Sequence, residues 1–214
     1  MLAFGVVNFS DDIFTEPEPD PDTLANLGPL TGLAGTWHGE GIDVHPVKFG
    51  SEESPYIEDY TLEPIDPQTN GPQLLYGLRY HTHIVQPDEV ETFHDQVGYW
   101  LWEPSSEMVT LLVAIPRAQV LLASGHAGPL ASHFELQATE GNLDSGICSG
   151  TFLLHGFRTT SYRIEVATHS DGTWSYVQDT LIQVRGREEL FHHTDRNTLH
   201  RLSPPAPNPL VSRA

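Results

Sequence analysis

Cysteine, basic residues and long apolar runs are scarce in this chain of 214 residues. A single cysteine, Cys148, excludes a disulfide bond within the chain, so a reducing cytoplasm is the expected location. Ten lysines and arginines stand against 29 acidic residues, and the formal charge of −19 repels phosphate backbones. Nucleic acid is therefore not an expected partner. No apolar run approaches the roughly twenty residues that a membrane-spanning helix needs, so no membrane span is expected.

Acidic and proline-rich segments flank the part of the chain that has regular patterning. Residues 10–23 combine six acidic residues with three prolines, a composition that cannot bury enough apolar surface to offset the entropy of ordering it. Prolines recur after residue 203, and they cannot donate to a sheet ladder. We expect an acidic N-terminal arm over residues 1–23, one domain over residues 24–202 and a proline-rich tail over residues 203–214.

Alternation of polar and apolar residues predicts an all-β domain. The run from Trp174 to Val184 has the clearest period of two. Besides a glycine-rich first strand, strands are expected at residues 56–62, 73–84, 91–103, 108–115, 119–124, 132–138, 152–154, 159–167, 173–184 and 198–202. Roughly ten short strands at hairpin spacing favour a single antiparallel, closed β-barrel. A barrel of that width is too wide for side chains alone to fill, so a ligand inside it is expected.

The glycine-rich first strand is the run from Gly35 to Gly41, which reads GTWHGEG. Glycine inside a strand marks a bend, a bulge or a close backbone approach, so this strand is expected to bend at the start of the barrel. Trp37 is expected to close one barrel end. Leucines at a spacing of three within residues 24–34 predict short helical turns that cover the same end.

The pattern Gly-x-Trp-x-Gly-x-Gly in this strand resembles the opening strand of the nitrobindin family. Nitrobindins are heme-binding β-barrels related in shape to fatty-acid-binding proteins and lipocalins. The resemblance extends over residues 30–202 in the order of the elements. It departs at His45-Pro46-Val47, where nitrobindins have Tyr-Pro-Thr.

The resemblance implies heme b as the cofactor, held by a histidine of the last strand. Counting back from Leu202 by the family pattern reaches Thr194, one residue beyond His193. His193 is therefore the expected iron ligand, with His192 as the alternate, because strand alternation lets only one of these neighbours enter the barrel. Thr36 and Trp37 are expected to contribute to the cofactor site.

A second histidine is expected on the distal side of the heme. The segment from Phe93 to Trp100 resembles the nitrobindin strand whose histidine points toward that side, which implies this role for His94. The alternative is a hydrogen-bonded core or rim histidine without function. The family resemblance further implies NO binding at ferric heme and isomerisation of peroxynitrite to nitrate. The apolar stripe Leu111, Val113 and Ile115 is a candidate pocket wall, although core packing is the commoner cause of such a stripe.

Three alternatives remain open from the residues. Arg158 and Tyr162 could anchor the carboxylate of a fatty acid, which would make the protein a carrier of an apolar ligand. His81 and His83 share one strand face and could bind a divalent metal if a third ligand joined them, whereas a solvated polar face is the plainer explanation. A barrel that acts only through surface contacts is the third alternative.

Overall fold

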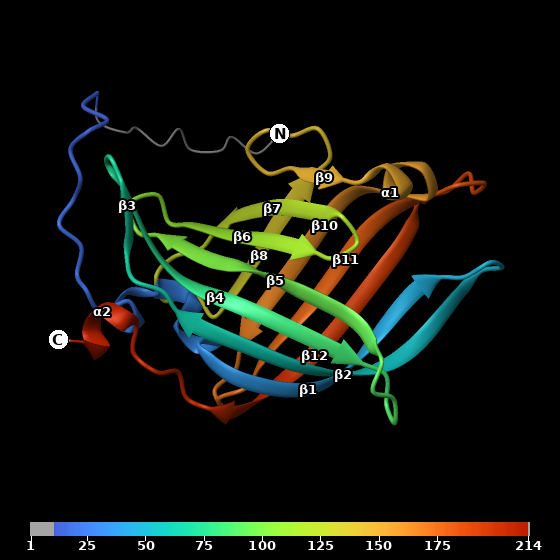
Figure 1. Ribbon diagram of the computed structural model, residues 1–214, viewed down its shortest axis with the longest axis horizontal. Coiled ribbons are helices and arrows are strands. Elements are labelled where there is room, and N and C mark those ends of the chain that lie inside the picture. Colours follow the sequence, from blue (N-terminus) through green and yellow to red (C-terminus); the bar gives the residue numbers. More distant parts are fainter. Residues whose placement is uncertain (1–10, 214) are drawn as a thin grey trace.

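The computed structural model describes residues 11–213, so residues 1–10 of the predicted arm over residues 1–23 and the last residue, Ala214, lie outside the described residues. Ten antiparallel strands form a closed barrel (Figure 1). They are β1 (Gly35–Pro46), β2 (Ser51–Pro64), β4 (Gln73–Val85), β5 (Thr92–Glu103), β6 (Met108–Ile115), β7 (Gln119–His126), β8 (His133–Thr139), β10 (Phe157–Thr168), β11 (Trp174–Val184) and β12 (Phe191–Ser203). Because β12 pairs with β1 and β2 pairs with β4, the sheet closes on itself. The all-β barrel expected from the sequence is confirmed.

Short elements decorate the barrel. Strand β3 (Gln68–Asn70) pairs with β4, and β9 (Ile147–Ser149) pairs with β7. Two 3-10 helices, η1 (Leu24–Asn26) and η2 (Gly28–Leu33), precede β1, and α2 (Pro209–Ser212) follows β12. Helix α1 (Thr151–Gly156) stands where residues 152–154 were expected to form a strand, so that expectation is wrong. A three-residue apolar run carries too little periodicity to separate strand from helix.

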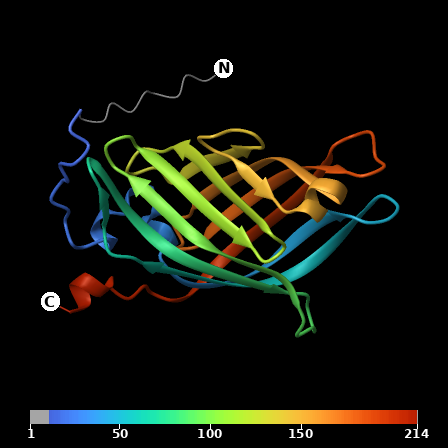
Figure 2. The same ribbon diagram turned by 45° about the horizontal axis from the view of Figure 1, so that its top comes forward.

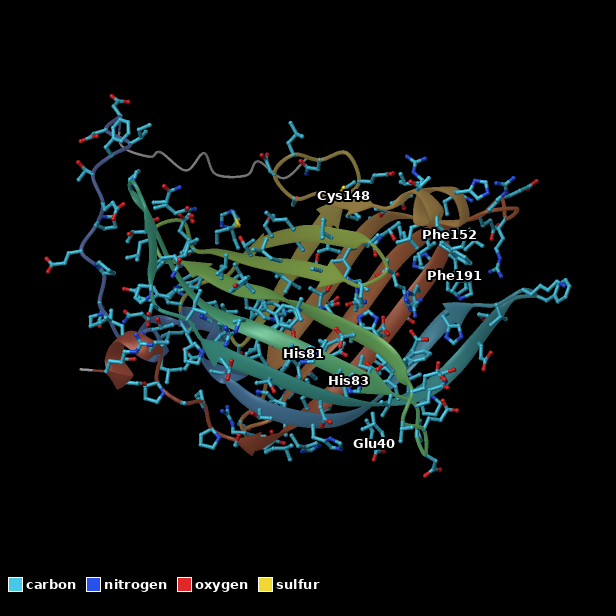
Figure 3. The ribbon with its side chains drawn as sticks, viewed as in Figure 1. Glu40, His81, His83, Cys148, Phe152 and Phe191 are labelled. Atoms are coloured by element: carbon cyan, nitrogen blue, oxygen red, sulfur yellow. The ribbon has the colours of Figure 1, made fainter. Side chains whose placement is uncertain are left out.

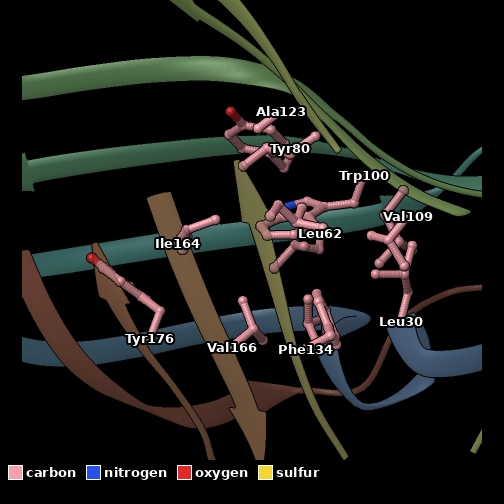
Figure 4. Packing of buried hydrophobic residues seen from close by; sticks show 14 of the residues in the cluster. Leu30, Leu62, Tyr80, Trp100, Val109, Ala123, Phe134, Ile164, Val166 and Tyr176 are labelled. Atoms are coloured by element: carbon pink, nitrogen blue, oxygen red, sulfur yellow. The ribbon is translucent and has the colours of Figure 1, made fainter. Parts of the chain in front are cut away.

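One end of the barrel is filled with side chains. Leu27, Leu30 and Leu33 from the 3-10 helices are fully buried, as the leucine spacing predicted. Trp37 lies beneath them, donates from Nε1 to the Leu33 carbonyl at 2.7 Å and packs edge-on against Trp174. Figure 4 shows part of this cluster, from Leu30 at the cap to Tyr176 farther along the barrel. This packing leaves the opposite end of the barrel as the place for a cavity.

The glycines of β1 have a different role from the expected bend. Residues Gly39 and Gly41 pair in unbroken register with β2, and the irregularity of the strand lies earlier, between Thr36 and Trp37. A Cβ on Gly41 would overlap the ring of Tyr56, and one on Gly39 would lie 2.6 Å from the side-chain oxygen of Asn197. These glycines therefore make room inside the barrel for the side chains of neighbouring strands.

The barrel wall is weakest between β7 and β8. Within the described residues, Ser124 with Gln137 is the single register pair that joins these strands. Farther along β7, the short strand β9 takes the place of β8 as partner (Figure 2). We call this sparsely paired stretch between β7 and β8 the seam.

The two terminal segments meet at the filled end. Asn208 is fully buried, and its side chain donates to the Pro21 carbonyl and to Asp66 and accepts from the Thr23 amide. The residues on either side of the barrel domain are thus tied together. Among the elements of residues 11–213, no helix combines the length and apolar character needed to cross a bilayer.

Candidate functional site

A cavity of about 630 Å³ lies at the end of the barrel where α1 sits. One side is apolar and is built from β6, β7 and α1, including the expected stripe Leu111, Val113 and Ile115. The facing side is polar and comes from β1, β2, β11 and β12. The volume falls within the range of about 300–1,000 Å³ typical of small-molecule and cofactor sites.

Strand alternation places His193 in the cavity and His192 outside it. His193 lines the cavity, and its inward-facing strand neighbours are Asp195, Asn197 and the fully buried Leu199. The side chain of His192 is 65% exposed and contacts Asp179 at 2.9 Å on the outer face. Of the two histidines predicted as the iron ligand, only His193 is placed to meet an internal cofactor.

A carboxylate cluster surrounds His193 on the polar wall. Asp43 and Asp195 are directly opposite one another in the β1–β12 ladder. Asp43 contacts the Nε2 of His193 at 2.6 Å through one oxygen and the Nδ1 of His45 at 2.5 Å through the other. Asp195 lies 3.9 Å from the same Nε2 and accepts from the amide of Gln178 at 3.0 Å.

The charges in this cluster are unequally distributed. Burial and the neighbouring charge of Asp43 raise the pKa of Asp195 to about 8, against the attraction of His193. Burial also acts to raise the pKa of Asp43, but the hydrogen bond and charge of His193 outweigh it, so its pKa is lowered. Burial opposes protonation of His193, yet its two carboxylate neighbours raise its pKa. Asp43 is therefore the more acidic of the two carboxyls, and Asp195 is the one that holds a proton more readily.

A second acidic group lies deeper in the cavity wall. Glu58 is 1% exposed and accepts from the hydroxyls of Thr82 at 2.6 Å and Tyr176 at 2.8 Å and from the amide of Asn197 at 2.7 Å. The Tyr176 hydroxyl also contacts that of Tyr56 at 2.9 Å. Burial raises the pKa of Glu58 despite these three donors.

His94 lines the cavity near His193. Burial lowers its pKa, and the nearby charges of Arg117 and His193 add to the effect. Its Nε2 lies 3.4 Å from the side-chain oxygen of Gln96, which leaves the ring weakly held. A neutral imidazole with one donor and one acceptor nitrogen therefore faces the cavity.

Other predicted site residues lie away from the cavity. Trp37 and Thr36 belong to the filled end of β1, and neither is among the residues that line the cavity. Arg158 is half exposed and pairs with Glu140 at 2.7 Å on the outer surface, whereas Tyr162 does line the cavity. The fatty-acid alternative therefore loses the cation that it relied on.

The paired histidines of β4 also face outward. His81 and His83 project from the outer face of the barrel (Figure 3), where His81 contacts Asp95 at 3.0 Å and His83 contacts the Thr92 hydroxyl at 3.0 Å. Neither belongs to the cluster of potential metal ligands found among residues 11–213. The plainer expectation, a solvated polar face, describes their surroundings.

Sequence reasoning missed Asp43, Asp195, His45 and Glu58. The spacing of residues along the strands could have identified two of these residues. Asp43 is an even number of residues from the buried Trp37, and Asp195 is an even number from the buried Leu199. Side chains at such spacings share a strand face. Acidic residues on the inward face of a strand are costly to bury, which marks them as candidates for function.

Comparison with known proteins agrees with this architecture. Residues 26–201 match the family described as the THAP4-like, heme-binding beta-barrel domain. The crystal structure of Rv2717c from M. tuberculosis is similar with a TM-score of 0.56 and 21% sequence identity, over 84% of this chain and 96% of that chain, which indicates a shared fold. None of the curated proteins matches this chain. The expected nitrobindin-like resemblance is confirmed, and the chain belongs to the THAP4-like heme-binding β-barrel domain family.

Proposed function

We propose that this protein binds heme b in the barrel cavity, with the imidazole of His193 as the axial ligand. The observation that carries the proposal is the placement of His193 on the inner wall of a cavity large enough for a cofactor. The neighbouring His192 is exposed on the outer face of the barrel and does not point toward the cavity. Membership of a heme-binding family supports the same assignment.

The residues around His193 fit a heme on one condition. The apolar wall of β6, β7 and α1 suits a flat hydrophobic ring, and the imidazole opposite it supplies a nitrogen donor. In the structure, however, the Nε2 of His193 is bonded to Asp43. Iron coordination by that nitrogen requires this hydrogen bond to open, whereas coordination by Nδ1 leaves it in place.

Heme iron in this cavity would supply NO binding and the isomerisation of peroxynitrite to nitrate, the activity that the nitrobindin resemblance implies. The protein contributes the surroundings of that chemistry. The apolar wall excludes water, and the neutral imidazole of His94 can hold a small polar molecule by one hydrogen bond. Exposed Arg117, which also lines the cavity, places a positive charge at the edge of the site and attracts an anion such as peroxynitrite.

Hemin titration of the purified protein tests the axial ligand. We expect a saturable shift of the Soret band that is lost in His193→Ala and retained in His192→Ala, which changes the adjacent residue on the outer face. Retention of the shift in His193→Ala would overturn the assignment. Native mass spectrometry of the purified protein gives an independent readout, because an acyl-chain mass in place of a porphyrin mass would favour a lipid carrier.

The role of His94 requires a separate measurement. In the hemin complex, His94→Ala is expected to leave the Soret position nearly unchanged and to accelerate NO dissociation about fivefold, because a hydrogen bond to a ligand contributes about 1 kcal/mol. Flash photolysis or stopped-flow mixing measures this rate. An unaltered rate would show that His94 is a rim histidine without a part in ligand binding.

A further inference from the structure

Three potential metal ligands converge on the polar wall of the cavity. Asp43, His193 and Asp195 each offer one ligand atom, and these atoms all lie within 4.8 Å of one another. They come from two neighbouring strands, β1 and β12, whose hydrogen-bonded register sets Asp43 opposite Asp195. We propose that these three residues bind a divalent transition-metal ion of the zinc class in the absence of heme.

The separations of the ligand atoms suit such an ion. Bonds of about 2.0–2.2 Å in a tetrahedral arrangement place ligand atoms about 3.4 Å apart. The His193 nitrogen lies 2.6 Å from Asp43 and 3.9 Å from Asp195, so the two observed separations bracket that value. Binding of the ion would therefore lengthen the first separation and shorten the second.

Neighbouring side chains already orient both carboxylates. The ring of His45 holds the second oxygen of Asp43 at 2.5 Å, and the amide of Gln178 donates to Asp195 at 3.0 Å. Hydrogen bonds of this kind fix the direction of ligand oxygens and are a regular part of metal sites. The arrangement therefore has both the potential ligands and the groups that support them.

The mixture of donors selects the class of ion. One imidazole with two carboxylates suits zinc or ferrous iron better than copper(I), which prefers sulfur, or magnesium, which prefers oxygen alone. Three protein ligands leave one coordination position free, and all three residues line the cavity. A small molecule in the cavity can therefore reach the ion.

This site and the proposed heme site share His193 and are expected to exclude one another. The proposed cation site does not depend on heme binding, because the carboxylates of Asp43 and Asp195 supply two of its three ligands. Asp195→Asn separates the two: it removes a cation ligand while leaving the imidazole of His193 for hemin. Zinc bound to the wild-type protein should in turn reduce the hemin Soret shift.

Titration of the heme-free, chelator-treated chain tests the site. We expect one Zn²⁺ per chain by calorimetry and a Co²⁺ visible spectrum typical of nitrogen and oxygen ligands. Asp43→Asn and Asp195→Asn should each weaken binding at least about tenfold. The matched controls are His192→Ala and Asp179→Asn, which remove a histidine–aspartate pair on the outer face of β12 and β11.

Each outcome of this experiment decides the proposal. Absence of binding to the wild-type chain, or unchanged binding in a folded Asp195→Asn variant, would overturn it. Equal weakening by the two control substitutions would do so too, because it would locate the ion on the outer surface. Zinc binding without any hemin binding would support the cation site and remove the heme proposal.

Discussion

Glu58 is a carboxyl group sealed among a threonine, a tyrosine and an asparagine, with three donors around it. Because burial raises its pKa above the ordinary value of 4.5, the folded state holds the proton more tightly than the unfolded state. Its contribution to stability is therefore complete below that value and is lost as pH rises through the folded pKa.

Glu58→Gln should remove the loss of stability at higher pH, because a glutamine side chain does not ionise. The melting temperature of the variant relative to wild type is expected to rise between pH 5 and pH 8, by about 2–4 °C for each kcal/mol recovered in a chain of this size. Calorimetry or circular dichroism measures it. Glu53→Gln, on the exposed part of the same strand, is the control and should show no such trend. A difference independent of pH would contradict the assignment.

Gly41 tests the role of the inward glycines. Gly41→Ala pushes a methyl group into the ring of Tyr56, whose hydroxyl is bonded to Tyr176. Overpacking of this kind costs about 1–3 kcal/mol, which urea denaturation would detect. Gly128→Ala is the control, because a Cβ there meets nothing within 4 Å. Equal stability of the two variants would show that Tyr56 moves aside at little cost.

At the same scale, the sequence predicts which residues of one strand share a face. It does not predict which residues of strands distant in the sequence become neighbours. His193 and Leu199 are six residues apart, so the burial of Leu199 alone would place His193 inside and His192 outside. The contact of Asp43 with Asp195 could not be found this way. It depends on the register between the first and last strands, which local patterning does not report.

At the scale of elements, most strand positions were predicted, and two departures border the cavity. Strand β12 begins at Phe191 and not at residue 198, because its first half is polar on both faces where it borders the cavity. Residues 152–154 form part of α1, where Phe152 reaches the cavity while remaining 69% exposed. Both departures occur beside the site, where function and not core packing selects the residues.

The seam between β7 and β8 should open more readily than the rest of the wall. Amides whose hydrogen bonds lie at an incomplete strand pair exchange through local opening, at lower free energy than global unfolding. Peptides covering residues 119–139 are expected to take up deuterium before those covering residues 35–64, where β1 and β2 pair over twelve positions. Hydrogen-exchange mass spectrometry measures both, and equal protection would mean that the seam is closed by side chains.

At the scale of the whole molecule, the terminal segments are part of the folded unit. Composition predicted an acidic arm and a proline-rich tail on either side of the domain, and in the structure Asn208 of the tail joins Pro21, Thr23 and Asp66 in a fully buried position. Composition identified these segments as poor in apolar surface but gave no sign of one asparagine that satisfies three backbone and side-chain partners.

Asn208→Ala should therefore weaken the whole fold. The substitution leaves the Thr23 amide and the Pro21 carbonyl without partners, at a cost of about 1–3 kcal/mol. Asn70→Ala, at an exposed position of β3, is the control and should stay within about 0.5 kcal/mol of wild type. Urea denaturation of wild type and the two variants measures the free energy of unfolding. If Asn208→Ala were as stable as the Asn70→Ala control, the tail would be only loosely attached to the barrel.

The polar wall and the apolar wall of the cavity face one another, so the interior is polar on one side and apolar on the other. Acidic side chains occupy β1 and β12, and hydrocarbon occupies β6 and β7, so a guest molecule with one charged edge has a single favourable orientation. An anionic edge is repelled by the acidic side chains of Asp43 and Asp195, and exposed Arg117 is the arginine that lines the same cavity among residues 11–213. Binding in the barrel cavity therefore depends on how charge is distributed over a ligand as well as on the size of the ligand.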